Sequence, residues 1–271
     1  MPIPLPRLEC VKPTRLEEAL VWSAVPDAYF IAGGQGLIWQ MRLGRVAPRI
    51  LVDILGLNEL DRITPLGGGF RVGALVNLST IARRSDLGLL AMAAGHVGTA
   101  PIRNFGTLGG NLGYRAATGE VRLALWTLGG GLEKVDAQGS LHAVQGEGLF
   151  ATDQSPALTT AAIVPEHQWT GACFREFGPQ GSWVPDIALS AVIDTRRRRG
   201  CFAVITRTGA RYRAQLSDDF MHPALDRRIL EAHAVPLNEI GDALDSGGEW
   251  VAGLVADTVS AAVSSSVVDD V

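Results

Sequence analysis

The most conspicuous shortage in this sequence of 271 residues is lysine. Only Lys12 and Lys134 occur among 24 basic residues, so the other 22 (24 − 2) are arginines. Neither lysine stands between a glycine and a serine or threonine, which excludes the lysine-containing phosphate loop of nucleotide hydrolases. Acidic residues number 28 and the net charge is −4, a balance that argues against nucleic acid as a partner.

The chain also lacks the residue patterns of metal and nucleophile chemistry. Its three cysteines are far apart and include no Cys-x-x-Cys pair, which disfavours a disulfide framework, a four-cysteine zinc site and an iron–sulfur cluster held by this chain alone. The five histidines show no His-Glu-x-x-His spacing, and no Gly-x-Ser-x-Gly motif is present. The sequence therefore assigns no metal ligand and no catalytic residue.

Long apolar runs are missing as well. The longest stretch without Asp, Glu, Lys or Arg covers residues 87–102 and is interrupted by glycines and a proline, so it is too short and too broken to span a bilayer. The first eleven residues contain prolines, Arg7 and Glu9 where a secretory signal would need a continuous apolar stretch. We therefore expect no membrane span and a cytoplasmic location.

What the chain has in excess is glycine, with 32 of 271 residues, where an average protein has about 7%. The glycines have no period of three, which excludes collagen, and 47% of the residues are hydrophobic, which is ample for folded cores. The backbone must therefore turn tightly, or approach something closely, at many points.

Apolar segments separated by turn residues predict an α+β fold with mixed sheets. Strands are expected at residues 7–11, 29–32, 49–54, on both sides of 67–69, in a hairpin over 132–144, and at 171–177, 201–206 and 211–216. Helices are expected at residues 14–23, 37–43, from 79 or 80 to 84, and at 87–97, 121–128 and 248–263. Residues 186–194 suit either a strand or a helix, and 196–199 suit a hairpin turn.

Two local features add to this outline. Thr14 and Glu17 have the spacing of a capping box at the start of the first helix. The segment from Ile102 to Asn111 is expected to be a loop, because its glycines are too closely spaced for a helix.

Two glycine-rich segments are candidate ligand loops. Ala32–Leu37 (AGGQGL) lies between an expected strand and an expected helix, a geometry in which unpaired backbone N–H groups bind phosphate. Because it contains no basic residue, neutral amides would have to hold the anion. Gly106–Asn111 (GTLGGN) offers a hydroxyl, a side-chain amide and three glycines for a second wall of the same site. Neither is the Gly-x-Gly-x-x-Gly fingerprint, and such turns also occur for purely structural reasons.

Five segments, in their order and spacing, resemble the FAD-binding (medium) subunit of the molybdenum hydroxylases, the family of the xanthine dehydrogenase and aerobic carbon monoxide dehydrogenase flavoproteins. They are Ala32–Gly34, Leu51–Ile54, Gly69–Ala74, Ile102–Asn104 and Gly106–Asn111. This similarity covers residues 1–165, and the segment 186–190 with the final helix resembles the family's C-terminal flavoprotein domain.

The resemblance implies an FAD-binding fold in which two α/β subdomains, residues 1–57 and 58–166, clasp FAD, followed by a C-terminal α+β domain, residues 170–271. The two glycine loops would bind the diphosphate and ribityl chain, and the C-terminal domain would help to cover the flavin ring. The implied cofactor-binding residues are Ala32, Gly33, Gly34, Gln35, Gly36, Leu37, Gly106, Thr107, Gly109, Gly110, Asn111, Glu120 and Ile187.

The resemblance also implies a function. The chain would be an electron-transfer oxidoreductase subunit in a complex with an iron–sulfur subunit and a molybdopterin subunit. Its flavin would take electrons singly from the partner's iron–sulfur clusters and pass them to NAD, a quinone or oxygen. Two alternatives stay open: a stand-alone FAD-dependent oxidoreductase or oxygenase, and a scaffold subunit that has lost FAD.

The chain departs from the family pattern in both loops. The family usually has threonine or serine followed by an acidic or polar residue in the first loop, where this chain has Gln35 and Gly36. An aspartate commonly follows the second loop, where this chain has Glu120. Glu120 could hydrogen-bond a ribityl hydroxyl or the flavin edge, or it could be only a helix N-terminal carboxylate favoured by the dipole. Arg103 could neutralise phosphate or tie a loop.

Overall fold

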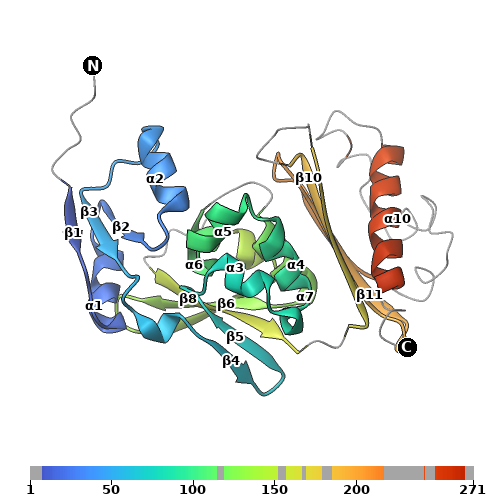
Figure 1. The fold of residues 1–271 in the computed structure, drawn as a ribbon, viewed down its shortest axis with the longest axis horizontal. Helices are drawn as coiled ribbons and strands as arrows, with labels where there is room; N and C mark the ends of the chain where they lie inside the picture. The colour runs from blue at the N-terminus through green and yellow to red at the C-terminus, as the bar shows by residue number, and fades with distance from the viewer. Residues whose placement is uncertain are drawn as a thin grey trace. The chain divides into compact units, whose positions relative to one another are not determined.

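The computed structural model describes residues 8–114, 119–151, 157–166, 169–178, 185–216, 241 and 248–265. The chain forms two compact units, each assembled from three segments. Figure 1 shows the helices and strands that make them up. Unit 1 comprises residues 1–83, 97–115 and 130–165, and unit 2 comprises residues 84–96, 116–129 and 166–271. The three domains expected from the sequence, at residues 1–57, 58–166 and 170–271, stay a prediction.

Unit 1 contains a small parallel sheet of strand order β1-β3-β2 and an antiparallel sheet of strand order β4-β5-β8-β6-β7. Its strands are β1 (Glu9–Val11), β2 (Ala28–Ile31), β3 (Ile50–Asp53), β4 (Ile63–Leu66), β5 (Gly69–Gly73), β6 (Gly131–Asp136), β7 (Leu141–Gln145) and β8 (Ala157–Pro165). Its α-helices are α1 (Leu16–Leu20), α2 (Gln35–Arg42), α3 (Leu78–Ala82), α5 (Ala100–Phe105) and α6 (Leu108–Gly113). Short 3-10 turns cover Val21–Ala24, Asn58–Leu60 and Gly146–Phe150.

Apolar packing of α1 holds the parallel sheet of unit 1. Ala19 and Leu20 of α1 are buried in one cluster with Val52 of β3 and with Ile54 and Leu57, which follow β3. Because β1, β3 and β2 are parallel, all three point their carboxyl ends to the same edge, and the chain leaves that edge of β2 directly into α2. The sheet therefore fixes the place where the first glycine loop starts.

The capping-box prediction at the start of α1 is wrong by one residue. Thr14 bonds to Glu18 instead of Glu17, with its backbone N–H 2.9 Å and its hydroxyl 3.1 Å from Oε2 of that carboxylate. Arg15 is the N-cap residue and provides no side-chain cap. Helix α1 has only five residues before the 3-10 turn begins. The Glu18 carboxylate holds the segment just before this short helix through its bonds to Thr14.

Unit 2 is built on one antiparallel sheet of strand order β12-β11-β10-β9. Its strands are β9 (Gly171–Phe177), β10 (Ile187–Asp194), β11 (Arg199–Thr206) and β12 (Arg211–Leu216). Among the described residues of this unit, the helices are α4 (Leu89–His96), which follows a 3-10 turn at Ser85–Leu87, α7 (Glu120–Leu128) and α10 (Gly248–Ser265). The overall class is α+β, as the sequence predicts.

The sequence of residues 186–194 suits either a strand or a helix, and the structure has a strand there, β10. All eight of its residues are buried, because α10 and α7 cover opposite faces of the strand. Alternate residues such as Leu189 and Ile193 pack in one cluster with Val255 of α10. Ser190, on the other face, hydrogen-bonds Thr127 of α7 across 2.5 Å. A strand that is covered on both faces has a continuous run of apolar residues instead of an alternating pattern. Periodicity alone therefore cannot distinguish its sequence from that of a buried helix.

The basic run at residues 196–199 forms the hairpin turn that the sequence predicts. Asp194 and Arg199 face each other at the ends of β10 and β11, and Arg198 adopts a left-handed conformation with φ of 50°. The buried Asp194 accepts the backbone N–H of Arg197 at 3.1 Å. The run is therefore a local turn held by a buried carboxylate.

Candidate functional site

The first candidate loop connects β2 to α2 in unit 1. Gly34 has φ of +71°, a left-handed conformation that favours glycine, and it is the N-cap of α2. The first intrahelical bond runs from Ile38 N–H to Gly34 C=O, so the amides of Gln35, Gly36 and Leu37 have no intrahelical acceptor. No side chain caps them within the described part of the chain. A row of free N–H groups at the positive end of a helix can bind an anion.

The second candidate loop, Gly106–Asn111, is more ordered than the sequence predicts. The expectation of one loop from Ile102 to Asn111 is wrong, because α5 covers its first part and α6 its last. Thr107 is the N-cap of α6 and its hydroxyl accepts the Gly110 N–H at 3.1 Å. Close packing outweighs the low helix propensity of glycine here.

Backbone contacts attach this second loop to the segment after β5. Leu108 N–H donates to Val76 C=O at 2.9 Å, and Gly109 N–H donates to Ala74 C=O at 2.7 Å. A methyl group on Gly109 would lie 2.8 Å from Cβ of Ala74, so glycine is needed for this approach. The loop is therefore held from behind by main-chain hydrogen bonds.

The two loops lie against each other. A methyl group on Gly33 would overlap the carbonyl oxygen of Phe105, so the first loop touches the backbone that links α5 to α6. A methyl group on Gly36 would lie 2.7 Å from Cδ2 of Tyr114, the residue that ends α6. Eleven of the thirteen sequence-predicted cofactor residues are thereby brought together in unit 1, namely Ala32–Leu37, Gly106, Thr107 and Gly109–Asn111.

The polar groups exposed on these loops suit a diphosphate and polyol chain. Gly110 is exposed, and the side-chain amide of Asn111 makes no hydrogen bond with the described protein. Thr107, in contrast, is only 1% exposed and its hydroxyl already caps α6. The uncapped amides of α2 and the Asn111 side chain can donate to an anion such as a diphosphate, with Thr107 shaping the loop.

Arg103 ties a loop, which is the structural one of the two roles expected for it, the other being to neutralise phosphate. One guanidinium nitrogen donates to two backbone carbonyls, at 3.0 Å to Val97 and 2.7 Å to Gly98. These bonds fix the turn that precedes α5. Arg103 is therefore occupied by these carbonyls, and the loops themselves offer an anion only neutral groups, as expected from the lack of basic residues within them.

The remaining two predicted residues belong to unit 2. Ile187 is fully buried in the apolar cluster beneath α10. Glu120 is the first residue of α7, next to Gly119 in a left-handed conformation, which agrees with the helix N-terminal interpretation. Cofactor contact by these two residues stays a prediction.

Glu120 belongs to a charged cluster that sequence reasoning missed. Burial raises the pKa of the Glu120 carboxyl, and the nearby Glu176 carboxylate raises it further, while His96 and Arg122 oppose the shift. Nδ1 of His96 lies 3.3 Å from Oε2 of Glu176. The cluster joins the end of α4, the start of α7 and strand β9, segments too distant in sequence for any spacing to reveal them.

Glu120→Gln is expected to stabilise the apo-protein at neutral pH, because the folded state would no longer bury that charge. The pKa of Glu120 in the folded protein lies above its ordinary value of 4.5. The folded state therefore binds more protons than the unfolded state, and the contribution of Glu120 to the free energy of unfolding is lost as pH rises through the folded pKa. The melting-temperature gain of the variant should therefore grow over that window, and then level off. Thermal denaturation from about pH 4 to about pH 8 measures it. The exposed Glu17→Gln is the control, and a gain independent of pH would contradict the shift.

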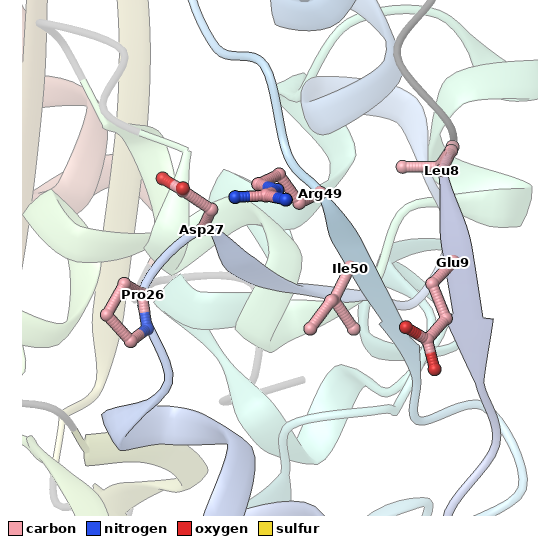
Figure 2. A pocket seen from close by; sticks show the side chains of 6 residues that line it. All are labelled: Leu8, Glu9, Pro26, Asp27, Arg49 and Ile50. Carbon is pink, nitrogen blue, oxygen red and sulfur yellow. The ribbon is translucent and has the colours of Figure 1, made fainter.

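A separate hollow in unit 1 lies away from the glycine loops. Figure 2 shows its six lining residues, Leu8, Glu9, Pro26, Asp27, Arg49 and Ile50. They belong to the amino ends of β1, β2 and β3, whereas Gly33–Leu37 follows the carboxyl end of β2. Ligands of open parallel sheets bind beyond the carboxyl ends of the strands. This hollow is therefore not part of the candidate site.

The described residues form neither a metal-binding group nor a membrane-spanning helix. They contain no group of three or more His, Cys, Asp or Glu side chains arranged to hold a metal ion. In the same part of the chain, no helix has both the length and the apolar character needed to cross a bilayer. The cytoplasmic location stays a prediction.

The chain is similar to known proteins in sequence and in fold. Residues 6–166 match the family described as the FAD binding domain in molybdopterin dehydrogenase. The chain is also similar to the nicotine 6-hydroxylase medium subunit of Paenarthrobacter nicotinovorans, with 28% identity over 273 residues, 94% of this chain and 95% of the relative.

Solved structures share the fold along nearly the whole chain. Quinoline 2-oxidoreductase from Pseudomonas putida 86 has a TM-score of 0.74 at 19% identity, covering 97% of this chain and 98% of that one. Reconstituted CO dehydrogenase from Oligotropha carboxidovorans has a TM-score of 0.76 at 18% identity, covering 96% and 97%. At these identities the likeness shows the fold alone.

Proposed function

The chain belongs to the family of FAD binding domains in molybdopterin dehydrogenases, and from that premise we propose that it carries electrons between a partner's iron–sulfur clusters and an external acceptor. FAD is the cofactor of the family, and the chain is the flavoprotein subunit of an oxidoreductase. The similarity to a protein named as a medium subunit supports a complex of several subunits. The proposed partners are an iron–sulfur subunit and a molybdopterin subunit.

The observation that carries the proposal is the contact between two loops that leave the amides of Gln35–Leu37 and the side chain of Asn111 without a hydrogen-bond partner among the described residues. The uncapped amides of Gln35–Leu37 would bind the diphosphate, and Gly110 and Asn111 would bind it and the ribityl chain from the second loop. Bound FAD supplies a centre that accepts electrons singly and releases them singly or in pairs. The protein supplies binding and orientation, which agrees with the lack of any nucleophile or acid–base motif in the sequence.

The presence of Gln35 and Gly36 in the first loop does not imply that the chain is a scaffold subunit that has lost FAD. The Gln35 side-chain amide donates to Gly33 C=O at 3.2 Å and braces the loop. Gly36 leaves room for the Tyr114 ring. Both departures from the family pattern therefore have local structural reasons that leave the amides of α2 free.

Purification of the chain from its own host under non-denaturing conditions tests the proposal. We expect FAD in a one-to-one ratio, and two further subunits that carry the iron–sulfur and molybdopterin centres. Anaerobic reduction of that complex, followed by separate addition of NAD, a quinone or oxygen, would identify the acceptor by which one reoxidises the flavin. A chain isolated with FAD but without partners would favour the stand-alone oxidoreductase.

A further inference from the structure

Tyr114 lies at the junction of the two glycine loops, where the sequence gives no reason to expect a functional residue. It follows the last residue of α6, and its backbone N–H donates to Gly110 C=O at 2.9 Å. Its ring lies against Gly36 in the first turn of α2, and a methyl group on Gly36 would be 2.7 Å from Cδ2 and 3.1 Å from Cγ. Only a glycine at position 36 admits the ring without displacement.

The phenol hydroxyl of Tyr114 is available for a ligand. Tyr114 is half-buried, and among the described residues its side chain makes no hydrogen bond. The amides of Gln35, Gly36 and Leu37, in the helix turn that the ring contacts, are also without a side-chain cap. The ring whose base packs against this turn therefore carries a half-buried hydroxyl without an acceptor, and the turn itself carries amides without an acceptor.

The first loop of this chain lacks a hydroxyl of its own. Its one polar side chain is that of Gln35, whose amide is turned back to Gly33 C=O at 3.2 Å. The next residue, Gly36, has no side chain. The hydroxyl is thus missing at the turn against which the Tyr114 ring packs.

We propose that Tyr114 is a further FAD-binding residue, whose hydroxyl donates a hydrogen bond to the diphosphate and replaces, from the second loop, the hydroxyl that the first loop lacks. Gly36 and Tyr114 then act together. The glycine makes room for the ring, and the hydroxyl at the far end of the ring donates to the phosphate that the amides of α2 bind. This inference rests on the proposed function, because it requires FAD at the two loops.

Titration of the apo-form of the full chain with FAD, followed by flavin fluorescence, tests the inference. Tyr114→Phe keeps the ring and removes only the hydroxyl, so its dissociation constant for FAD should rise roughly 10-fold to 100-fold, the usual effect of a hydrogen bond to a charged acceptor. Melting of the apo-form should not change. Adding Gln35→Thr to Tyr114→Phe should recover most of the affinity, because it restores a hydroxyl in the first loop. Tyr29→Phe, at an exposed tyrosine of β2 in the same unit, should leave the affinity unchanged.

The outcomes separate the inference from the function on which it rests. Equal affinity of Tyr114→Phe and the unaltered chain would overturn the inference and leave the function standing. A loss of affinity matched by a lower apo-form melting temperature, without rescue by Gln35→Thr, would overturn it too, because the ring would then have only a structural role. Failure of the unaltered chain to bind FAD would overturn the proposed function itself.

Discussion

Gly33→Ala is expected to reduce FAD binding more than 100-fold and to lower the stability of unit 1 by about 3 kcal/mol. The added methyl group would overlap the carbonyl oxygen of Phe105, which belongs to a backbone held by Gly106 N–H donating to Ile102 C=O at 2.6 Å. A backbone neighbour cannot turn away as a flexible side chain can, so the two loops would have to separate. Since both loops are proposed to bind the same diphosphate, separation removes half of the site.

Equilibrium titration of the full chain with FAD, together with chemical denaturation of the apo-form, measures both effects of Gly33→Ala. Gly56→Ala is the matched control in the same unit, because a methyl group at Gly56 would meet nothing within 4 Å. The control should bind FAD like the unaltered chain. An unimpaired Gly33→Ala variant would mean that the loops are not packed together as the structure shows.

Gly171→Ala is expected to destabilise unit 2 by about 3 kcal/mol. A methyl group at the start of β9 would overlap the carbonyl oxygen of Ala262 in α10. At the same point Ser265 Oγ accepts the Ala172 N–H at 3.1 Å, so the end of α10 is attached to the strand by hydrogen bonding as well as by packing. Moving the helix away would expose buried residues such as Val255 and Val259.

Chemical denaturation with separate probes for the two units measures this effect. Gly253→Ala in α10 is the matched control, since nothing lies within 4 Å of a methyl group there and alanine is a better helix former by up to about 1 kcal/mol. It should be neutral or stabilising. If Gly171→Ala unfolded like the unaltered chain, α10 would not rest on β9 as described.

Periodicity and turn residues predict much of the fold because most elements carry their own signals. The alternation around Gly139 predicts a hairpin, which β6 and β7 form. The apolar spacing of residues 121–128 predicts α7, which begins one residue earlier. These patterns act within a few residues and depend little on the rest of the chain.

The features that the sequence did not predict depend on contacts between residues far apart in the chain. The segment from Ile102 to Asn111 forms two short helices because main-chain bonds from Leu108 and Gly109 to the strand-side segment hold it there, and those partners are over thirty residues away. The contact of Tyr114 with Gly36 joins residues even farther apart. The one sign of this contact in the sequence is Gly36, which stands where the family pattern has a polar residue. That departure suggested a subunit that has lost FAD, but in the structure the glycine makes room for the Tyr114 ring.

A structure of the full chain bound to FAD tests the central claim most directly. We predict that the diphosphate lies within hydrogen-bonding distance of the amides of Gln35–Leu37, with Gly110 and Asn111 on its other side. The hydroxyl of Tyr114 should reach the same phosphate oxygens. A diphosphate bound elsewhere, for example in the hollow lined by Asp27 and Arg49, would contradict the account.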